Sequence, residues 1–387
     1  MSLFSYSYIR RKFNSGLNRF SRKREHAYVL GLPYEVQLVP TNACNLRCKS
    51  CPKTYYNTDN RHLAPEAYDR VKKELFPHIR ILDLQGLGEP LLSPLFPQMV
   101  EDAYHHGIKI RFVSNATKFT PFLMKRLVEC GADVTISLDG ACAETHEDAR
   151  PGAGFSLILN VMEEFRSLKN QFKSSDFHLS INTVVTKRNV YELEAILDLG
   201  IRHQITAFSL INPGVGDRKD DYALSVIAHY PELFSEQLNK LIPKAQAHSI
   251  ILQYPYLKKT TEQNLNSPGT EKVKPLSDQR LFPGKCFDPW RLTYIDVDGW
   301  VRPCCRAIWI GMGNIMEKPF REIWNDAPYK ELRRYVNSNN PPDFCRTCTL
   351  FWGITRGNEL YMEDLEKRGI ELSPPPFIGL RDNAHKG

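Results

Sequence analysis

Three cysteines in the first part of the chain lie close enough together in sequence to hold one metal centre. Cys44, Cys48 and Cys51 follow the spacing C-x3-C-x2-C, and no fourth cysteine lies close by. Three thiolates on a four-iron cluster leave one iron without a protein ligand, and chemistry at a metal requires such an open position. A zinc site that takes its fourth ligand from elsewhere has the same sulfur donors and is the alternative.

A second group of cysteines lies near the other end of the chain. Cys286, Cys304, Cys345 and Cys348 supply four thiolates, which is a complete ligand set for one more four-iron cluster or for a structural zinc ion. The pattern C-x12-G-x4-C, which runs through Gly299, favours Cys304 over its neighbour Cys305 as the second ligand.

Glycine and polar residues follow successive β-rich runs, at the point where each run ends. These residues are Gly86, Gly88, Glu89, Asn115, Ser137, Asp139 and Asn182, and Arg150 follows shortly after the fourth run. Each motif is weak by itself. Because parallel strands end at a common rim where ligands bind, the sequence predicts one binding site beside the first cysteine group.

The elements that would position these residues alternate along the chain. We expect strands at 35–40, 80–85, 109–114, 133–138, 178–185 and 206–211, and helices at 64–76, 94–106, 119–130, 155–172 and 189–199. Six β/α units in succession predict an α/β fold with a parallel sheet, a partial (β/α)6 TIM-like barrel that is short of the eight units of a closed one.

The whole sequence is predicted to divide into five parts. They are a basic amphipathic segment at 1–33, the partial barrel at 34–212, a barrel completion and connector at 213–285, a small cysteine-rich module at 286–350 and a tail at 351–387. Helical periodicity returns within the connector, at about 231–247.

Composition and charge exclude several classes of protein. The chain has 387 residues, 42% hydrophobic and 25% charged, and no apolar run is long enough to span a membrane. The net charge of +7 arises mainly from residues 1–27, so no basic face for nucleic acid is indicated. Without a secretion signal we expect a cytoplasmic protein, in which ten cysteines indicate metal or catalysis rather than disulfides.

The first 27 residues predict an amphipathic helix. Tyr6, Ile9, Phe13, Leu17 and Phe20 recur on one helical face, and basic residues fill most of the rest. Such a helix could dock on the barrel itself, lie on an anionic membrane surface or act as an organelle presequence. With about 43 residues before Cys44, we expect no fused leader-peptide-binding domain.

The cysteine loop and the rim motifs together resemble the radical S-adenosylmethionine (SAM) superfamily over about residues 35–212. The resemblance implies a SAM-binding [4Fe-4S] cluster on Cys44, Cys48 and Cys51, whose open iron chelates SAM. It further implies contacts from the motif Gly86-Leu87-Gly88-Glu89-Pro90 to the methionine amino group. The segment from Ser137 through Asp139 to Arg150 would contact ribose and carboxylate, and Asn182 would lie near adenine. Asn115 lies in a motif that usually ends in glycine, where this chain has Ala116.

The second cysteine group resembles the SPASM/Twitch extensions of radical SAM enzymes. Pro289-Trp290, Asp298-Gly299, Gly313-Asn314-Ile315 and Cys345-x2-Cys348 belong to this pattern. The chain has too few cysteines for the two-cluster form, so the resemblance implies a second, auxiliary [4Fe-4S] cluster, with structural zinc as the alternative.

The expected activity is reductive cleavage of SAM to a 5′-deoxyadenosyl radical, which takes hydrogen from an unactivated C–H bond. By resemblance, the first expectation is dehydrogenation or epimerisation of a sugar or cyclitol. The alternatives are modification of a ribosomal peptide or of a lipid-linked substrate. Flavodoxin or ferredoxin would supply electrons. A non-enzymatic two-site zinc scaffold is the alternative from another class.

Cys142 is a candidate hydrogen donor. It follows the fourth rim motif by two positions, where a substrate radical would form, and a thiol S–H bond is weak enough to quench such a radical. An epimerase needs such a donor and a dehydrogenase does not. Cys305 is a second candidate, and Cys130 is interpreted as a small buried residue.

Overall fold

The architecture is that of a computed structural model, which describes residues 3–55, 59–213, 220–222, 225–254, 285–305, 307–308, 310–342 and 345. Its centre is one sheet of ten strands in the order β10-β9-β8-β1-β2-β3-β4-β5-β6-β7. The strands are β1 (Glu35–Leu38), β2 (Ile81–Asp83), β3 (Lys109–Ser114), β4 (Asp133–Ser137), β5 (His178–Val184), β6 (Ala207–Ile211), β7 (Ile251–Gln253), β8 (Leu292–Ile295), β9 (Trp300–Arg302) and β10 (Gly313–Asn314).

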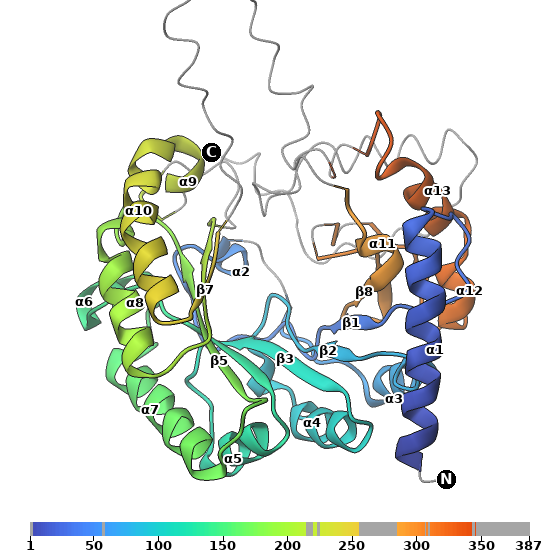
Figure 1. Cartoon of the computed structure of the whole chain (residues 1–387), viewed down its shortest axis with the longest axis horizontal. Coiled ribbons are helices and arrows are strands. Elements are labelled where there is room, and N and C mark those ends of the chain that lie inside the picture. Colours follow the sequence, from blue (N-terminus) through green and yellow to red (C-terminus); the bar gives the residue numbers. More distant parts are fainter. Residues whose placement is uncertain are drawn as a thin grey trace, which may run out of the picture.

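Strands β1 to β7 pair in parallel, each with the next along the chain, and curve into a partial barrel (Figure 1). The six predicted strands and the α/β class are confirmed, and β7 adds a seventh parallel strand within 213–285, the segment predicted to complete the barrel. The short length of β7 explains why the sequence pattern did not predict it, since a strand of three residues carries little periodicity.

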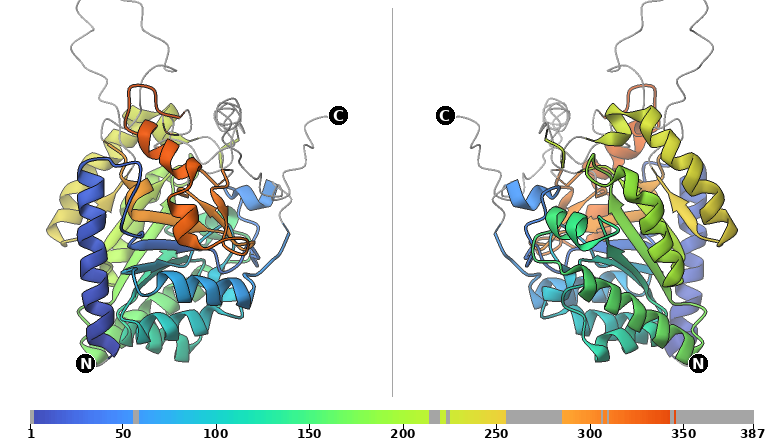
Figure 2. Two further views of the ribbon diagram at one scale, coloured as in Figure 1. Left: turned by 90° about the vertical axis from the view of Figure 1, so that its right-hand side faces the viewer. Right: turned by 90° about the vertical axis from the view of Figure 1, so that its left-hand side faces the viewer.

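A layer of helices covers the outer face of the parallel strands (Figures 1 and 2). Its members are α3 (Pro65–Leu75), α4 (Phe96–His105), α5 (Pro121–Glu129), α7 (Phe155–Phe172), α8 (Leu193–Arg202) and α10 (Pro231–Ala247). In α7 the buried residues Ile158, Val161, Met162 and Phe165 recur at helical spacing, so one stripe faces the sheet. Phe165 stacks on Phe177 at a ring-centroid distance of 5.3 Å in the resulting core.

The short helices lie where loops cross the ends of the strands. They are α2 (Pro52–Tyr55), η1 (Pro90–Leu92), α6 (Ala143–Ala149), η2 (Val190–Glu192) and α9 (Val226–His229). Helix α6 was not predicted, and it places Arg150 directly at its C-terminal end.

Successive side chains of the parallel strands point alternately to the inner, concave face and to the core. In β3, Ile110, Phe112 and Ser114 are buried, whereas Arg111 and Val113 between them line a cavity on the concave side. Because side chains alternate between the two faces of a strand, every second residue of β3 to β6 is available to this cavity.

The cysteine-rich region continues the same sheet on the side of β1. Strand β8 pairs with β1 in parallel, Val36 opposite Thr293, and β9 and β10 follow antiparallel. Helices α11 (Asp288–Arg291), α12 (Phe320–Trp324) and α13 (Ala327–Tyr335) accompany these strands. The predicted boundaries of this region stay predictions, but its first strand and the barrel share backbone hydrogen bonds.

The N-terminal helix α1 (Leu3–Lys23) runs beside α11 at the edge of the barrel (Figures 1 and 2). The loop that follows is held by the C-terminal region: Trp290 Nε1 donates to His26 O at 2.8 Å, and Trp324 Nε1 donates to Gly31 O at 3.0 Å. Segments almost 300 residues apart in sequence therefore form one packed unit. Within the described residues, no helix has the length and apolar character needed to cross a membrane.

Candidate functional site

The first cysteine group lies on the loop that leaves β1. Cys44, Cys48 and Cys51 are all half-buried. The loop turns tightly, since Cys51 N donates to Cys48 O at 3.1 Å and Thr54 Oγ1 donates to the same carbonyl at 2.8 Å. Lys49 N donates to Ala149 O at 3.0 Å, which ties the loop to α6. The spacing of the cysteines is therefore converted into a fixed turn at the rim.

Burial changes the acidity of the three thiols. Desolvation raises the pKa of Cys44 and Cys51 and that of Cys48 to about 11, while the positive charge of Arg150 opposes the rise. The protein alone thus favours neutral thiols. Because iron binds thiolates, cluster assembly must displace these protons, and the soft sulfur donor set fits an iron–sulfur cluster.

Glu89 joins this loop to the next strand. It is 2% exposed, and its carboxylate accepts hydrogen bonds from Asn115 N at 2.7 Å, Ser114 Oγ at 2.8 Å and Leu91 N at 3.3 Å. Its own N–H donates to Ala43 O at 2.8 Å, immediately before Cys44. Burial raises the pKa of Glu89 against the pull of these hydrogen bonds. A buried carboxylate held in this way can receive a cationic amine without rearranging.

The two glycines of this motif are required by packing. A Cβ at Gly88 would lie 2.5 Å from the carbonyl oxygens of Ala43 and Thr41, and one at Gly86 would lie 2.5 Å from the Val39 side chain. Close approach to the cysteine loop therefore explains both glycines. Their predicted contacts to SAM stay predictions.

Asn115 and Ala116 form the next part of the rim. The Asn115 side chain donates to Asn45 Oδ1 at 3.0 Å and accepts from Thr117 N at 3.0 Å, so it too braces the cysteine loop. Ala116 has φ of +64° and is 1% exposed. This left-handed conformation favours glycine, which gives a physical reason for the residue that relatives usually carry here.

Asp139 and Arg150 form a buried ion pair beside the cysteines. Arg150 Nε donates to Asp139 Oδ2 at 2.7 Å, and Arg150 Nη1 lies 3.7 Å from Cys48 Sγ. Burial lowers the pKa of Arg150, but the Asp139 carboxylate and the nearby sulfurs raise it by more. The other Asp139 oxygen accepts from Val184 N at 2.8 Å, so this carboxylate positions Arg150, and its predicted contact to SAM stays a prediction.

Ser137 and Asn182 lie opposite each other in the paired strands β4 and β5. Ser137 is 7% exposed, and Asn182 lines the cavity. The amide oxygen Asn182 Oδ1 is buried and has no hydrogen-bond partner within the part of the chain that the structure describes. An unpartnered acceptor at this position fits a ligand that donates a hydrogen bond, such as the amino group of adenine.

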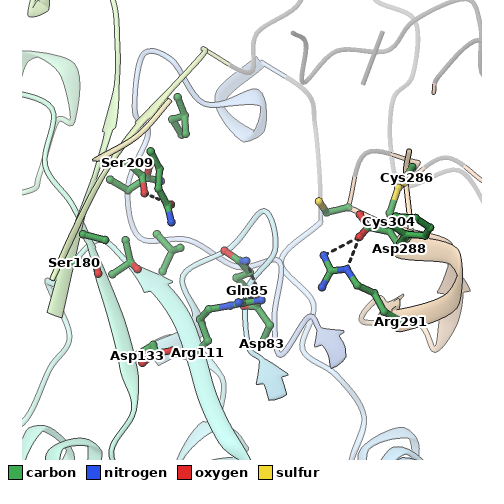
Figure 3. Close-up of a pocket in the computed structure, with 18 of the residues that line it drawn as sticks. Asp83, Gln85, Arg111, Asp133, Ser180, Ser209, Cys286, Asp288, Arg291 and Cys304 are labelled. Carbon is green, nitrogen blue, oxygen red and sulfur yellow. Dashed lines mark hydrogen bonds and ion pairs between the residues drawn. The ribbon is translucent and has the colours of Figure 1, made fainter. Parts of the chain in front are cut away.

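A cavity of about 1370 Å³ occupies the concave side of the sheet. Figure 3 shows Asp133, Ser180 and Ser209 on the barrel side and Cys286, Cys304, Asp288 and Arg291 on the opposite side. Asn182 is its link to the predicted SAM site, whereas the cysteines of the first loop are not among its lining residues. The cavity therefore extends from the rim to the second cysteine group.

A series of linked ion pairs lies along this cavity wall. Arg111 donates to Asp83 Oδ2 from Nε at 3.0 Å and also pairs with Glu35. Arg291 pairs in turn with Glu35 at 2.6 Å and with Asp288 at 2.7 Å. These ion pairs could not be predicted from the sequence, because their members are scattered over three strands and one helix and no motif contains them.

Within this series of ion pairs, the two carboxylate oxygens of Asp83 differ in their hydrogen bonds. Its Oδ2 also accepts from Gln85 Nε2 at 2.9 Å, but for the buried Oδ1 the described residues supply no hydrogen-bond partner. Burial raises the pKa of Asp83 to about 6, with Glu35 adding to the rise and Arg111 and Gln85 opposing it. Such a carboxylate can accept a proton near neutral pH.

The second cysteine group faces the same cavity. Cys286, Cys304, Cys305 and Cys345 all line it, and Cys348 lies outside the described residues. Cys286, Cys304 and Cys345 pack against one core cluster, whereas Cys305 packs against a separate one with Val39 and Tyr294. This grouping favours Cys304 as the ligand, in agreement with the spacing through Gly299, whose φ of +80° requires glycine at the β8–β9 turn.

The candidate hydrogen donors differ in position. Cys142 is exposed at the N-terminus of α6, where its sulfur lies 3.6 Å from Thr145 Oγ1, and it is not among the residues that line the cavity. Cys305 is half-buried and lines the cavity. The donor role of Cys142 stays a prediction, and the location of Cys305 favours that thiol instead.

Comparison with known proteins agrees with this site. Residues 38–200 match the model of the radical SAM superfamily, and residues 286–349 match that of the SPASM iron–sulfur cluster-binding domain. Mycofactocin maturase MftC of Mycobacterium ulcerans is 30% identical over 302 residues, which are 76% of this chain and 75% of that protein. The AdoMet-dependent heme synthase of Methanosarcina barkeri is 29% identical over 310 residues, 76% of this chain and 82% of that protein.

Solved structures share the fold. The structure of Streptococcus suis SuiB bound to S-adenosylmethionine has a TM-score of 0.58 at 17% identity, covering 81% of this chain and 71% of that one. The AdoMet-bound structure of anSMEcpe has a TM-score of 0.58 at 20% identity, covering 79% of this chain and 84% of that one. These likenesses support the partial barrel with its C-terminal extension.

Proposed function

Since this chain belongs to the radical SAM superfamily and carries a SPASM iron–sulfur cluster-binding domain, we propose that it oxidises or epimerises an alcohol carbon of a polar, sugar- or cyclitol-like substrate. The cofactors of this class are a SAM-binding [4Fe-4S] cluster, SAM itself and auxiliary iron–sulfur chemistry in the SPASM domain. The non-enzymatic zinc scaffold does not account for the superfamily match.

In the proposed mechanism the rim residues hold and orient SAM. Cys44, Cys48 and Cys51 would hold the cluster, which with SAM supplies the 5′-deoxyadenosyl radical that removes a hydrogen atom from the substrate. Glu89 would receive the methionine amino group and Arg150 the carboxylate, with Asp139 fixing the direction of the guanidinium. The burial of Glu89 and Asp139 excludes water from these contacts.

The observation that carries the proposal is the polar wall of the cavity. Ser180, Ser209 and Thr135 offer hydroxyl groups, and the same cavity is lined by Asp83, one buried oxygen of which has no hydrogen-bond partner among the described residues. Dehydrogenation would pass the C–H hydrogen atom to the 5′-deoxyadenosyl radical, which becomes 5′-deoxyadenosine, and the hydroxyl proton to Asp83. Cys286, Cys304, Cys345 and Cys348 would hold an auxiliary cluster, and the chemistry that such a cluster would supply is acceptance of the one remaining electron, which gives a carbonyl group on the substrate. A flavodoxin or ferredoxin would exchange electrons with the enzyme.

Epimerisation would instead return a hydrogen atom to the opposite face of the same carbon. This step needs a donor thiol that faces the substrate, and Cys305 lines the cavity whereas Cys142 does not. The donor would be left as a thiyl radical, which one electron from the flavodoxin or ferredoxin and one proton from water would return to the thiol. The two reactions are separated by turnover in deuterium oxide with the wild type, Cys142→Ala and Cys305→Ala. Deuterium at the product stereocentre that disappears in one variant supports epimerisation. An oxidised product without solvent deuterium supports dehydrogenation.

A second candidate is modification of a peptide. Its support is the 30% identity to mycofactocin maturase over 302 residues and the fold shared with SuiB, which has been crystallised with its precursor peptide SuiA. A cavity of about 1370 Å³ also has room for several residues of a peptide. We would measure 5′-deoxyadenosine formation with cyclitols, free sugars and short peptides. Stimulation by peptides alone would reject the alcohol substrate and favour this candidate.

A further inference from the structure

Helix α1 packs on the rest of the molecule through its polar face. Asn14 Nδ2 donates to Leu32 O at 2.9 Å, and Asn14 Oδ1 accepts from Leu32 N at 2.8 Å. Arg11 donates to Phe76 O at 3.2 Å, and Asn18 donates to Trp290 O. Both asparagines are at most 4% exposed. The helix is therefore held by hydrogen bonds to backbone carbonyls, which is the reverse of ordinary amphipathic packing.

Close contact on this side leaves no room for the helix to turn over. A Cβ at Gly31 would lie 2.9 Å from Asn18 N and 3.0 Å from Asn14 O, so the following loop passes directly against the helix backbone. Rotating the helix would bury Lys and Arg side chains and leave several backbone carbonyls without donors, which is costly. The outward direction of the opposite face is consequently fixed.

That opposite face is apolar and exposed. Ile9 is 55%, Phe13 68% and Phe20 49% exposed, and their spacings of four and seven residues place them in one stripe. Exposed basic residues flank the stripe on both sides: Arg10, Lys12, Arg19, Lys23 and Arg24. Residues 9–24 contain no acidic residue, and the adjacent Glu25 pairs with Lys285. One surface thus combines aromatic and aliphatic side chains with a purely basic border.

We propose that this outer face of α1 binds the surface of an anionic lipid bilayer. Ile9, Phe13 and Phe20 would enter the boundary between headgroups and acyl chains, and the basic border would contact lipid phosphates. A bilayer complements both the apolar stripe and the positive charge on either side of it. Because α1 is already folded and held in place, binding carries no cost of ordering the helix.

The position of α1 would bring a bound bilayer close to the cavity. Arg22, on the inner side of the helix, lines the cavity and lies 5.4 Å from the ring centroid of Phe287. A bilayer against the outer face would therefore lie one helix away from the cavity wall.

The experiment is flotation of the full-length, cluster-loaded chain with vesicles of phosphatidylcholine alone or mixed equally with phosphatidylglycerol. We expect preferential binding to the mixed vesicles, which weakens as salt is added. Ile9→Ser with Phe13→Ser should weaken binding by at least about tenfold. Arg19→Gln with Lys23→Gln should weaken it on the order of 25-fold. Both double variants should keep the wild-type melting temperature, because the replaced side chains face outward.

Matched controls lie on α5 and on the turn that precedes it, away from α1. Phe122, 78% exposed, is replaced by serine, and Lys118 and Lys125 are replaced by glutamine to give the same change in net charge. These variants should bind like the wild type. Equal losses in test and control variants would overturn the proposal, as would absence of binding to the mixed vesicles. A wild-type dimer that Phe13→Ser converts to monomer, without vesicle binding, would identify a second copy as the occupant instead.

Discussion

The rim around the first cysteine loop and the cavity wall that leads to the second cysteine group use their polar residues differently. At the rim, Glu89 accepts three hydrogen bonds, and both oxygens of Asp139 are engaged by Arg150 and Val184. On the cavity wall, one buried oxygen of Asp83 has no hydrogen-bond partner among the described residues. Rim carboxylates that the protein already holds in place suit one invariable cofactor, whereas a wall carboxylate with an unused acceptor suits a substrate that brings its own donor.

The two regions also differ in how they are assembled. The rim residues all lie within the segment 38–200 that matches the superfamily model, whereas the wall joins Asp83 from that segment to Glu35 and Arg291, which lie outside it. We therefore expect changes at the rim to abolish SAM chemistry, and changes on the wall to alter what happens to the substrate.

The largest effect should follow loss of the cysteines. The wild type should bind about eight irons per chain after anaerobic reconstitution, as two four-iron clusters. Cys44→Ala, Cys48→Ala and Cys51→Ala together should remove about half and abolish 5′-deoxyadenosine formation. Cys345→Ala with Cys348→Ala should remove the other half, lose product and keep uncoupled SAM cleavage. Loss of SAM cleavage in this second variant, with its first cluster intact, would contradict the division between the regions.

Asp83→Asn tests the cavity wall. If Asp83 accepts the substrate proton, product formation should fall by about 10²- to 10⁴-fold while SAM cleavage persists. In the wild type the carboxylate is available above its pKa of about 6, so product formation should decline as the pH falls below that value. The variant should lose this acid limb.

The matched control for Asp83 is Asp133→Asn. Asp133 lines the same cavity, and its buried Oδ1, like that of Asp83, has no hydrogen-bond partner among the described residues, but this oxygen lies 2.8 Å from the Lys109 ammonium. Equal loss of product in the two variants, or an acid limb that persists in Asp83→Asn, would reject Asp83 as the base. Both are read from product formation across pH 5 to 8, the range in which such a carboxyl would titrate.

Asp139→Asn tests how firmly the rim is organised. Removing one partner of a buried ion pair costs about 3–5 kcal/mol, because Arg150 stays buried without its counter-charge. The melting temperature and the affinity for SAM should both fall. Asp298→Asn breaks the partly exposed pair with Arg61 and should cost about 1 kcal/mol or less. Similar losses in the two variants would show that the rim is less constrained than its hydrogen bonds suggest.

The smallest effect is a gain of stability. Ala116→Gly relieves a left-handed backbone and should stabilise the folded chain by about 1 kcal/mol. Ala103→Gly, within helix α4, should instead destabilise it by about 1 kcal/mol. Thermal unfolding measures both changes, and a lower melting temperature for Ala116→Gly would mean that the alanine conformation carries no strain.

Much of the barrel could be predicted because its information is local. Alternation of period two in 109–114 and 178–185 and helical periodicity in 155–172 each lie within one element. The spacing of Cys44, Cys48 and Cys51 lies within eight residues, and the rim motifs follow from where parallel strands end. These features need no knowledge of distant contacts.

Only the tertiary structure decided the remaining features, because they join residues far apart in sequence. The pairing of β1 with β8, which attaches the second cysteine group to the barrel, has no local signal. The ion pair of Glu35 with Arg291 spans 256 positions and the bond from Asn18 to Trp290 spans 272. The periodicity of residues 9–20 predicted an amphipathic helix and docking as one of its uses, but not which face would dock. The rest of the fold places the backbone carbonyls of Leu32, Phe76 and Trp290 where they accept hydrogen bonds from the polar side of α1. The apolar side of the helix therefore faces outward.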